Sequence, residues 1–173
     1  MHLVKPLCLG ALVCAVTASS ALAATVVATN GDDRMHGTGS ANTIFGLGGD
    51  DRIAAGDGDD TVDGDGSCPP GSQDASYCQT GETDRDGNDT ISGGDGNDTL
   101  YGGGGDDTII GGNGDDTIAG GSANDAISAG DGNDVIDVRD GQKDTVNCGD
   151  GRDVVIADQI DRVARNCESV SRG

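Results

Sequence analysis

The sequence predicts an all-β protein assembled from stacked nine-residue repeats, and two observations carry this prediction. Gly supplies 32 of the 173 residues, and the 31 acidic residues are all Asp except Glu82 and Glu168. Only Phe45, Tyr77 and Tyr101 are aromatic, so the bulky side chains that packed helices or a large sandwich need are missing. A short motif also returns every nine residues, which is typical of stacked structural units.

Three consecutive segments fit one template without exception: residues 93–101 are GGDGNDTLY, 102–110 are GGGGDDTII and 111–119 are GGNGDDTIA. The template is G-G-x-G-x-D-x-U-x, in which U is a large aliphatic residue. Residue 138 shifts this frame by one position, and residues 64–83 interrupt it. Weaker copies extend the frame in both directions, at 28–36, 37–45, 46–54, 55–63, 84–92, 120–128, 129–137, 139–147 and 148–156.

Each recurring position of the template has a physical reason. Gly at positions 1, 2 and 4 allows a tight turn that visits φ > 0 and lets backbone carbonyls converge. Asp at position 6 offers the hard oxygen ligand that calcium prefers. The x-U-x triplet is typical of a short strand, and because neighbouring strand residues point to opposite faces, we expect only U to point inward.

The position-8 aliphatic residues are therefore the expected core, with one inward residue per copy. Burying one such side chain stabilises the fold by roughly 1.5–3 kcal/mol. Ordering nine residues costs on the order of 10 kcal/mol in conformational entropy. Because burial alone does not cover this cost, we expect metal binding to be coupled to folding. The series is Met35, Ile44, Ile53, Val62, Ile91, Leu100, Ile109, Ile118, Ile127, Ile136, Val146 and Val155.

The position-6 carboxylates are the expected metal ligands. The net charge of −21 would make the chain repel itself, and a divalent cation would neutralise it. The same charge argues against nucleic acid and anionic membrane as partners. Asn42 takes this position in its copy and is expected to weaken that site. The expected ligands are Asp33, Asp51, Asp60, Asp89, Asp98, Asp107, Asp116, Asp125, Asp134, Asp144 and Asp153, together with the turn glycines Gly94, Gly96, Gly103, Gly105, Gly112 and Gly114.

The three perfect copies resemble the repeats of the RTX, or haemolysin-type, calcium-binding proteins, and the resemblance covers residues 28–63 and 84–156. It implies a right-handed parallel β-roll (a β-solenoid) in which two repeats make one turn. It also implies Ca²⁺ held between the glycine turns of alternate repeats, by position-6 Asp side chains and turn carbonyls. Under this arrangement Asp89 would share one edge with Asp107 and Asp125, and Asp98 would share the other with Asp116 and Asp134.

Two features depart from that family. Its members commonly use an uncleaved C-terminal export signal, whereas residues 1–23 here are expected to be a cleaved signal peptide. Lys5 supplies the positive start, residues 7–16 are apolar, and Ala21-Leu22-Ala23 fits the cleavage pattern. The apolar run is shorter than the roughly 20 residues of a membrane span. The protease, lipase or toxin domain that often accompanies these repeats is also not expected in a chain of this length.

Four cysteines lie beyond the expected signal peptide, and an even number suggests two disulfides in an extracellular protein. Proximity in sequence favours Cys68 with Cys78 and Cys148 with Cys167, although four cysteines allow three pairings. A zinc site is disfavoured because no C-x-x-C is present and His36 is the only histidine beyond the signal segment. The expected organisation is a first repeat block at 24–63, an inserted disulfide-pinched loop at 64–83, a second block at 84–156 and a C-terminal cap at 157–173. The alternatives are two independent domains joined by 64–83, and a frayed tail.

The sequence therefore predicts a secreted calcium-binding protein without catalytic activity. Many like carboxylates at one period are better explained as metal ligands than as an acid/base pair. An EF-hand is excluded because neither Glu lies at the loop position that such a site requires. A disordered acidic segment would not place an aliphatic residue at every ninth position. The alternative function is an adhesive or ice-binding surface, suggested by position-7 threonines at Thr43, Thr61, Thr90, Thr99, Thr108 and Thr117.

Overall fold

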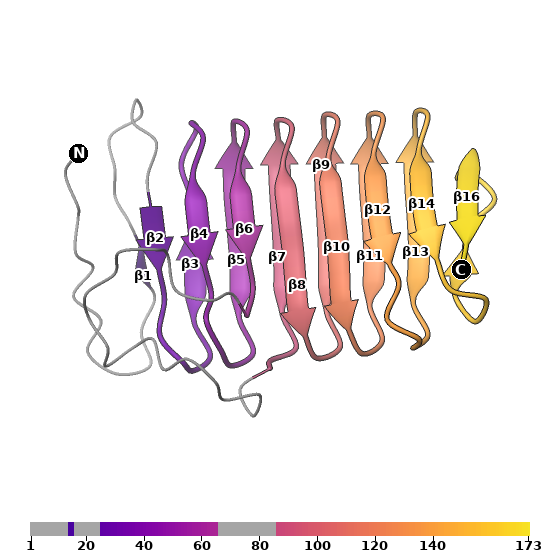
Figure 1. Ribbon diagram of the computed structural model, residues 1–173. Helices are drawn as coiled ribbons and strands as arrows, with labels where there is room; N and C mark the ends of the chain where they lie inside the picture. Colours follow the sequence, from indigo (N-terminus) through magenta and orange to yellow (C-terminus); the bar gives the residue numbers. More distant parts are fainter. Residues whose placement is uncertain (1–13, 16–24, 66–85) are drawn as a thin grey trace.

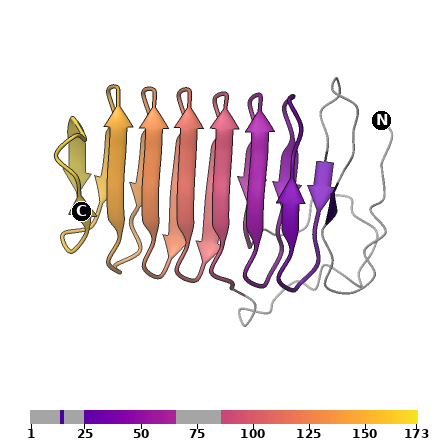
Figure 2. The ribbon, with the colours of Figure 1, turned by 180° about the vertical axis from the view of Figure 1, so that it is seen from behind.

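The computed structural model describes residues 14–15, 25–65 and 86–173, and within them every regular element is a β-strand. The odd-numbered strands form one eight-stranded sheet and the even-numbered strands form another. Figure 1 shows the coils stacked one after another from the indigo N-terminal end to the yellow C-terminal end, with both sheets running along the whole stack. Figure 2 shows the same stack from behind. The all-β parallel roll is confirmed. No helix in the described part of the chain is long and apolar enough to cross a membrane.

The strands that pair within each sheet are all parallel. The first sheet comprises β1 (Cys14–Ala15), β3 (Arg34–His36), β5 (Arg52–Asp57), β7 (Thr90–Asp95), β9 (Thr108–Asn113), β11 (Ala126–Asp131), β13 (Thr145–Asp150) and β15 (Arg162–Val163). The second comprises β2 (Thr25–Val27), β4 (Thr43–Phe45), β6 (Thr61–Asp63), β8 (Thr99–Gly104), β10 (Thr117–Ser122), β12 (Val135–Val138), β14 (Val154–Ala157) and β16 (Ser169–Arg172).

Two repeats make one coil of the roll. Thr90 of β7 lies opposite Thr108 of β9, so equivalent residues on one sheet are separated by two nine-residue units. The stack is also continuous across the interruption in the repeat, because β5 pairs with β7 and β6 pairs with β8. The alternative of two independent domains is therefore wrong, since both sheets run through this point without a break.

The strands are longer than the predicted x-U-x triplets. Strand β7 covers positions 7 to 9 of one repeat and positions 1 to 3 of the next, and its burial alternates, so Ile91 and Gly93 both face inward. The prediction that only U points inward was wrong, because the strand keeps its two-residue period for one more step. Position 1 is Gly in most repeats, but Ala55, Ala129 and Cys148 fill it elsewhere and join the core.

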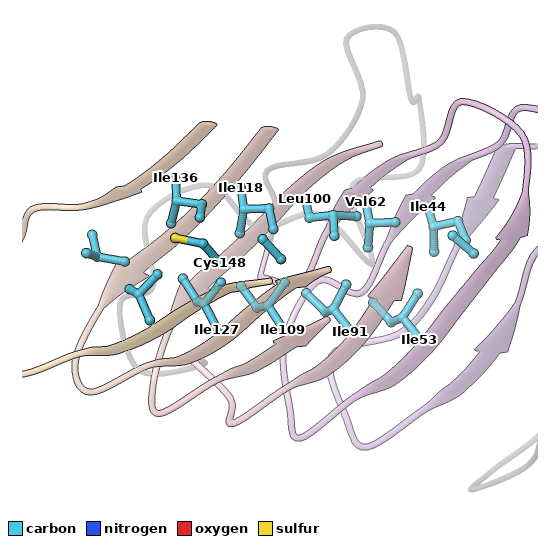
Figure 3. Close-up of a cluster of buried hydrophobic side chains, with 14 of the residues drawn as sticks. Ile44, Ile53, Val62, Ile91, Leu100, Ile109, Ile118, Ile127, Ile136 and Cys148 are labelled. Atoms are coloured by element: carbon cyan, nitrogen blue, oxygen red, sulfur yellow. The ribbon is translucent and has the colours of Figure 1, made fainter. Parts of the chain in front are cut away.

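The position-8 residues form the core as predicted. All twelve are buried, and even Ile53 and Ile127 are only 3% exposed. Figure 3 shows two facing rows, with Ile44, Val62, Leu100, Ile118 and Ile136 from the second sheet above Ile53, Ile91, Ile109 and Ile127 from the first. Because each row adds one side chain per coil, the core is a narrow column whose length follows the number of repeats.

The repeat ladder continues two residues beyond the predicted end of the first block. The amide of Gly64 donates to the carbonyl of Tyr101, and the amide of Asp65 donates to the carbonyl of Gly102. These contacts place Gly64 and Asp65 at positions 1 and 2 of a repeat. The rest of that repeat, from position 3 onward, is supplied by the chain from Asp86. The Asp65 carboxylate accepts hydrogen bonds from the amides of Gly87 and Gly104, which joins both ends of the inserted segment to the next coil.

The C-terminal tail completes the stack with one further coil. Strand β15 pairs with β13, and β16 pairs with β14. A disulfide joins Cys148, which points into the core, to Cys167 in the tail, as the spacing suggested. The frayed-tail alternative is wrong for these residues. Cys68 and Cys78, and most of the expected signal peptide, lie outside the described residues.

A core truncation should be far more costly than truncation of the neighbouring residue. Ile109→Ala should lower the free energy of unfolding by about 2–5 kcal/mol, because it leaves a cavity in the narrow core. Ile110→Ala is the matched control: Ile110 is 45% exposed on the outer face, so its change should stay within about 0.5 kcal/mol. Chemical denaturation of both variants at a fixed calcium concentration checks this. An equal loss of unfolding free energy in the two variants would contradict the placement of Ile109 inside the core and of Ile110 outside it.

Candidate metal centre

The position-6 side chains line up in two columns, one at each edge of the roll. Turns that follow odd-numbered strands form the first edge, and turns that follow even-numbered strands form the second. All twelve side chains are buried, and Asp33 is the most exposed at 7%. The first edge carries Asn42, Asp60, Asp98, Asp116, Asp134 and Asp153, and the second carries Asp33, Asp51, Asp89, Asp107, Asp125 and Asp144.

A hydrogen-bonded ladder connects the carboxylates within each column. The backbone N–H of Asp98 donates to Oδ1 of Asp116 at 2.8 Å, and that of Asp116 donates to Oδ1 of Asp134 at 2.8 Å. On the second edge the N–H of Asp89 donates to Oδ1 of Asp107 at 2.8 Å in the same way. The columns thus contain the neighbours that the family resemblance implied, each on the next coil.

The second carboxylate oxygen has no such partner in most rungs. Among the described residues it is buried without a hydrogen bond in eight side chains, and all eight belong to the position-6 series. A buried anionic oxygen without a partner is costly unless a cation or donor satisfies it. The eight are Asp60, Asp98, Asp116, Asp134 and Asp153 on the first edge, and Asp51, Asp89 and Asp107 on the second.

The glycine turns hold these carboxylates against the neighbouring coil. The six glycines expected to contribute carbonyls, at positions 2 and 4, all have φ between 95° and 139°. A Cβ at Gly94 would overlap the carbonyl oxygen of Gly56 on the preceding coil, so position 2 needs Gly for space as well as for conformation. Position 1 differs: Gly93 lacks a positive φ, but a Cβ there would overlap Oδ2 of Asp98.

Burial raises the pKa of these carboxyl groups. Desolvation raises the pKa of Asp51 and of Asp107 to about 8, and that of Asp116 to about 7. Hydrogen bonds from the backbone oppose this effect, and the neighbouring carboxylates add to it. Asp98 reaches a pKa of about 6 for the same leading reason. Burial therefore favours the protonated form of these four groups more than water does.

A second ladder at position 5 runs outside the first and in the opposite direction. Here the N–H of the later coil donates to the earlier side chain, as from Asn133 to Oδ1 of Asp115 at 2.8 Å. Asp and Asn alternate along the first edge through Asp59, Asn97, Asp115 and Asn133. The backbone and side-chain hydrogen bonds from Asn133 lower the pKa of Asp115. The alternation separates these exposed charges, because like charges on adjacent strands destabilise a sheet.

The columns end on residues that close them. Thr29 donates to Oδ2 of Asp33 through its amide at 2.8 Å and through its hydroxyl at 2.6 Å. Asn42 donates its side-chain amide to Oδ1 of Asp60 at 3.0 Å. At the other end Asp161 accepts from the amide of Asp144, and Glu168 accepts from the amide of Asp153. The sequence interpretation missed Asp161 and Glu168, because both lie outside the nine-residue frame.

Side chains alone do not make a metal cluster. In residues 25–65 and 86–173, no group of three His, Cys, Asp or Glu side chains converges as a metal site. Calcium accepts carboxylate and backbone carbonyl oxygens together. The carboxylate oxygens without a partner and the adjoining glycine turns are oxygen ligands of the kind that calcium accepts. They do not resemble the His and Cys ligand sets that are typical of zinc sites.

The threonines suggested as a surface array are divided between the two faces. Thr43, Thr61, Thr99 and Thr117 lie in register on the second sheet. Thr90 and Thr108 lie on the first. The two-repeat coil causes this division, since alternate repeats enter alternate sheets. The six threonines therefore do not form the single array that the alternative function required.

A family model described as RTX calcium-binding nonapeptide repeat (4 copies) matches the chain at residues 27–62, 84–118 and 110–142. These matches together cover more than half of the sequence and extend from the end of β2 to the turn that follows β12. No curated protein matches the sequence.

The raised pKa values predict an unusual pH dependence in chelator. An unfolded Asp has a pKa of about 3.9. The folded values of about 6 for Asp98 and about 8 for Asp107 are higher. Their stabilising contribution is therefore fully present below about pH 4 and is lost as the pH rises through about 6 to 8. In chelator, far-UV circular dichroism should therefore show more β structure at about pH 5 than at about pH 8.5, with a higher Tm wherever an unfolding transition is present. A higher Tm at the alkaline pH would contradict the burial of uncompensated carboxylates.

Proposed function

Because the chain belongs to the family of RTX calcium-binding nonapeptide repeat proteins, we propose that Ca²⁺ binds along both aspartate columns and that this binding drives folding. The observation that carries the proposal is the set of eight buried Oδ2 atoms without a hydrogen-bond partner. Carboxylate oxygens of this kind, beside turns rich in backbone carbonyls, are the ligands that calcium prefers. The family and the parallel β-roll support calcium binding; the ligand assignment and the coupling to folding are our proposals.

Position-6 carboxylates would hold each ion, and the glycine turns around them would supply carbonyls. In the central coils this assigns Asp98, Asp116 and Asp134 on the first edge, with Gly96 and Gly114 in their turns. The bound ion supplies positive charge between coils that otherwise place anionic oxygens one above another. The chain's own contribution is to fix each Oδ1 by a backbone N–H, so that Oδ2 remains free to face the cation.

The distribution of partnerless oxygens suggests how many ions bind. An interval between consecutive coils is a candidate site where both flanking carboxylates have an Oδ2 that is buried and has no hydrogen-bond partner. The first edge has four such intervals, between Asp60 and Asp153, and the second has two, between Asp51 and Asp107, which makes six. No interval of this kind lies beside Asp33, because its Oδ2 accepts hydrogen bonds from Thr29. None lies beside Asn42, because its side chain has no carboxylate.

Folding is coupled to calcium because the ions bind only the stacked turns. Consecutive carboxylates of a column come from coils that are separated by 18 residues in the regular region, so the unfolded chain has no preformed site. Any ligand that binds the folded state alone stabilises it in proportion to the logarithm of its concentration. Metal binding therefore supplies stabilisation that the narrow apolar core does not.

We propose that the protein is exported and works outside the cell. The predicted signal peptide at residues 1–23 and the disulfide between Cys148 and Cys167 support this location. Extracellular modules bind calcium with Kd values of about 10⁻⁴–10⁻³ M, so sites of modest affinity suffice there. We assign no catalytic residue, and the divided threonines give the adhesive or ice-binding alternative no support.

Calcium should convert the chain from a poorly ordered state to a β-rich one. Starting from chelator at about pH 7.5, far-UV circular dichroism should gain β signal cooperatively with calcium, and chelator should reverse the change. Magnesium is the control, because it demands a smaller, near-octahedral site and should not substitute. A spectrum that is already β-rich in chelator and is unchanged by calcium would overturn the coupling.

Removing one buried carboxylate should remove the ions on both sides of it. Asp116→Asn should reduce the bound calcium from six to four per chain, because Asp116 flanks two intervals. Asp115→Asn makes the same change of charge one residue away on the exposed ladder and should leave all of the ions bound. Native mass spectrometry with calorimetry measures both stoichiometries. Equal losses in the two variants would show that the ligand assignment is wrong.

A further inference from the structure

Two arginines lie side by side on the outer face of the first sheet. Arg34 of β3 and Arg52 of β5 are paired in register, and both are exposed. Adjacent parallel strands are about 4.8 Å apart, so the two side chains leave the sheet as immediate neighbours. The next two coils carry Thr90 and Thr108 at the same position of the repeat.

The position of these cations is unexpected in so acidic a chain. The sequence has 31 acidic and 10 basic side chains, so carboxylates are abundant partners. Within the described residues, the one ion pair found is between Arg139 and Asp137, so neither Arg34 nor Arg52 has a described carboxylate within 4.0 Å. Like charges directly opposite each other on a sheet are destabilising. The described part of the chain thus offers no compensation for placing them together.

The residues beside the arginine pair add further polar groups on the same face. His36 follows Arg34 by two residues and is exposed on the same face. Ala54 lies opposite His36, so the position beside the imidazole carries only a methyl group. On the next coil Thr90 lies opposite Arg52 and Ser92 lies opposite Ala54, which adds two hydroxyl groups.

We propose that Arg34, Arg52 and His36 form a binding site for one tetrahedral oxyanion group, sulfate or phosphate. Guanidinium groups present planar forks of N–H donors that match such oxygens, and two forks from adjacent strands reach one group from two sides. The imidazole and the hydroxyls add donors. The chain's net charge of −21 repels extended polyanions, so the site takes a single group rather than a nucleic acid strand.

The test is a titration of the calcium-loaded protein with inorganic sulfate, since sulfate avoids the precipitation of calcium phosphate. NMR shifts of the Arg side-chain N–H groups and of the His36 ring should move together and saturate. Arg52→Thr, which copies the residue found on the next coil, should weaken sulfate binding by about tenfold or more. Arg162→Thr is the matched control: Arg162 occupies the same position on the same sheet but lies opposite Thr145.

Both variants lose one positive charge next to a buried Asp, either Asp51 or Asp161, and circular dichroism in the same samples verifies that each remains folded. Unchanged affinity in Arg162→Thr with a loss in Arg52→Thr supports the site. An equal loss in both variants would reduce the effect to net charge, and shifts that never saturate would overturn the site. Because the fold is measured separately, a failure of calcium-driven folding is distinguishable from a failure of oxyanion binding.

Discussion

The roll is organised around a single electrostatic constraint, the stacking of carboxylates in two buried columns. Neighbouring members lie one strand spacing apart, about 4.8 Å. At an effective dielectric constant of about 20, two unit charges at that distance repel by roughly 3.5 kcal/mol. The backbone ladder satisfies Oδ1 and leaves Oδ2 of most members buried without a hydrogen-bond partner. The glycine turns, the narrow core and the closing residues at both ends all accommodate this arrangement.

The two hydrogen-bond ladders differ in burial and in charge: the position-6 ladder is buried and the position-5 ladder is exposed. The inner ladder links like charges and depends on neutralisation, whereas the outer ladder of the first edge alternates amide and carboxylate side chains, as with Asn97 and Asp115. Because the two ladders donate in opposite directions along the stack, the central turns are both donors and acceptors toward their neighbours. A coil is therefore held in register even where its carboxylates carry charge.

The nine-residue period determined most of what could be predicted. It identified the inward aliphatic series and the position-6 acids, because both depend on spacing that survives in weak copies. It could not give the strand length, since the inward role of position 1 is hidden where Gly occupies it, as at Gly93. It also missed Asp65, Asp161 and Glu168, whose roles follow from where the chain leaves the stack rather than from the period.

The assignment of alternate repeats to alternate sheets has a consequence for how such a chain can change length. Loss or gain of one nine-residue unit would send every later repeat to the opposite sheet, so that residues of the first sheet, such as Thr90 and Thr108, would exchange faces with those of the second, such as Thr99 and Thr117. Loss or gain of 18 residues would leave both faces and both edges in phase. A change of length between Asp65 and Asp86 escapes this rule, because the Asp65 carboxylate accepts from the amide of Gly87 and both ends therefore belong to the same turn. Duplication of repeat pairs, with free growth at such a turn, is therefore the evolutionary path that preserves the pattern of this surface.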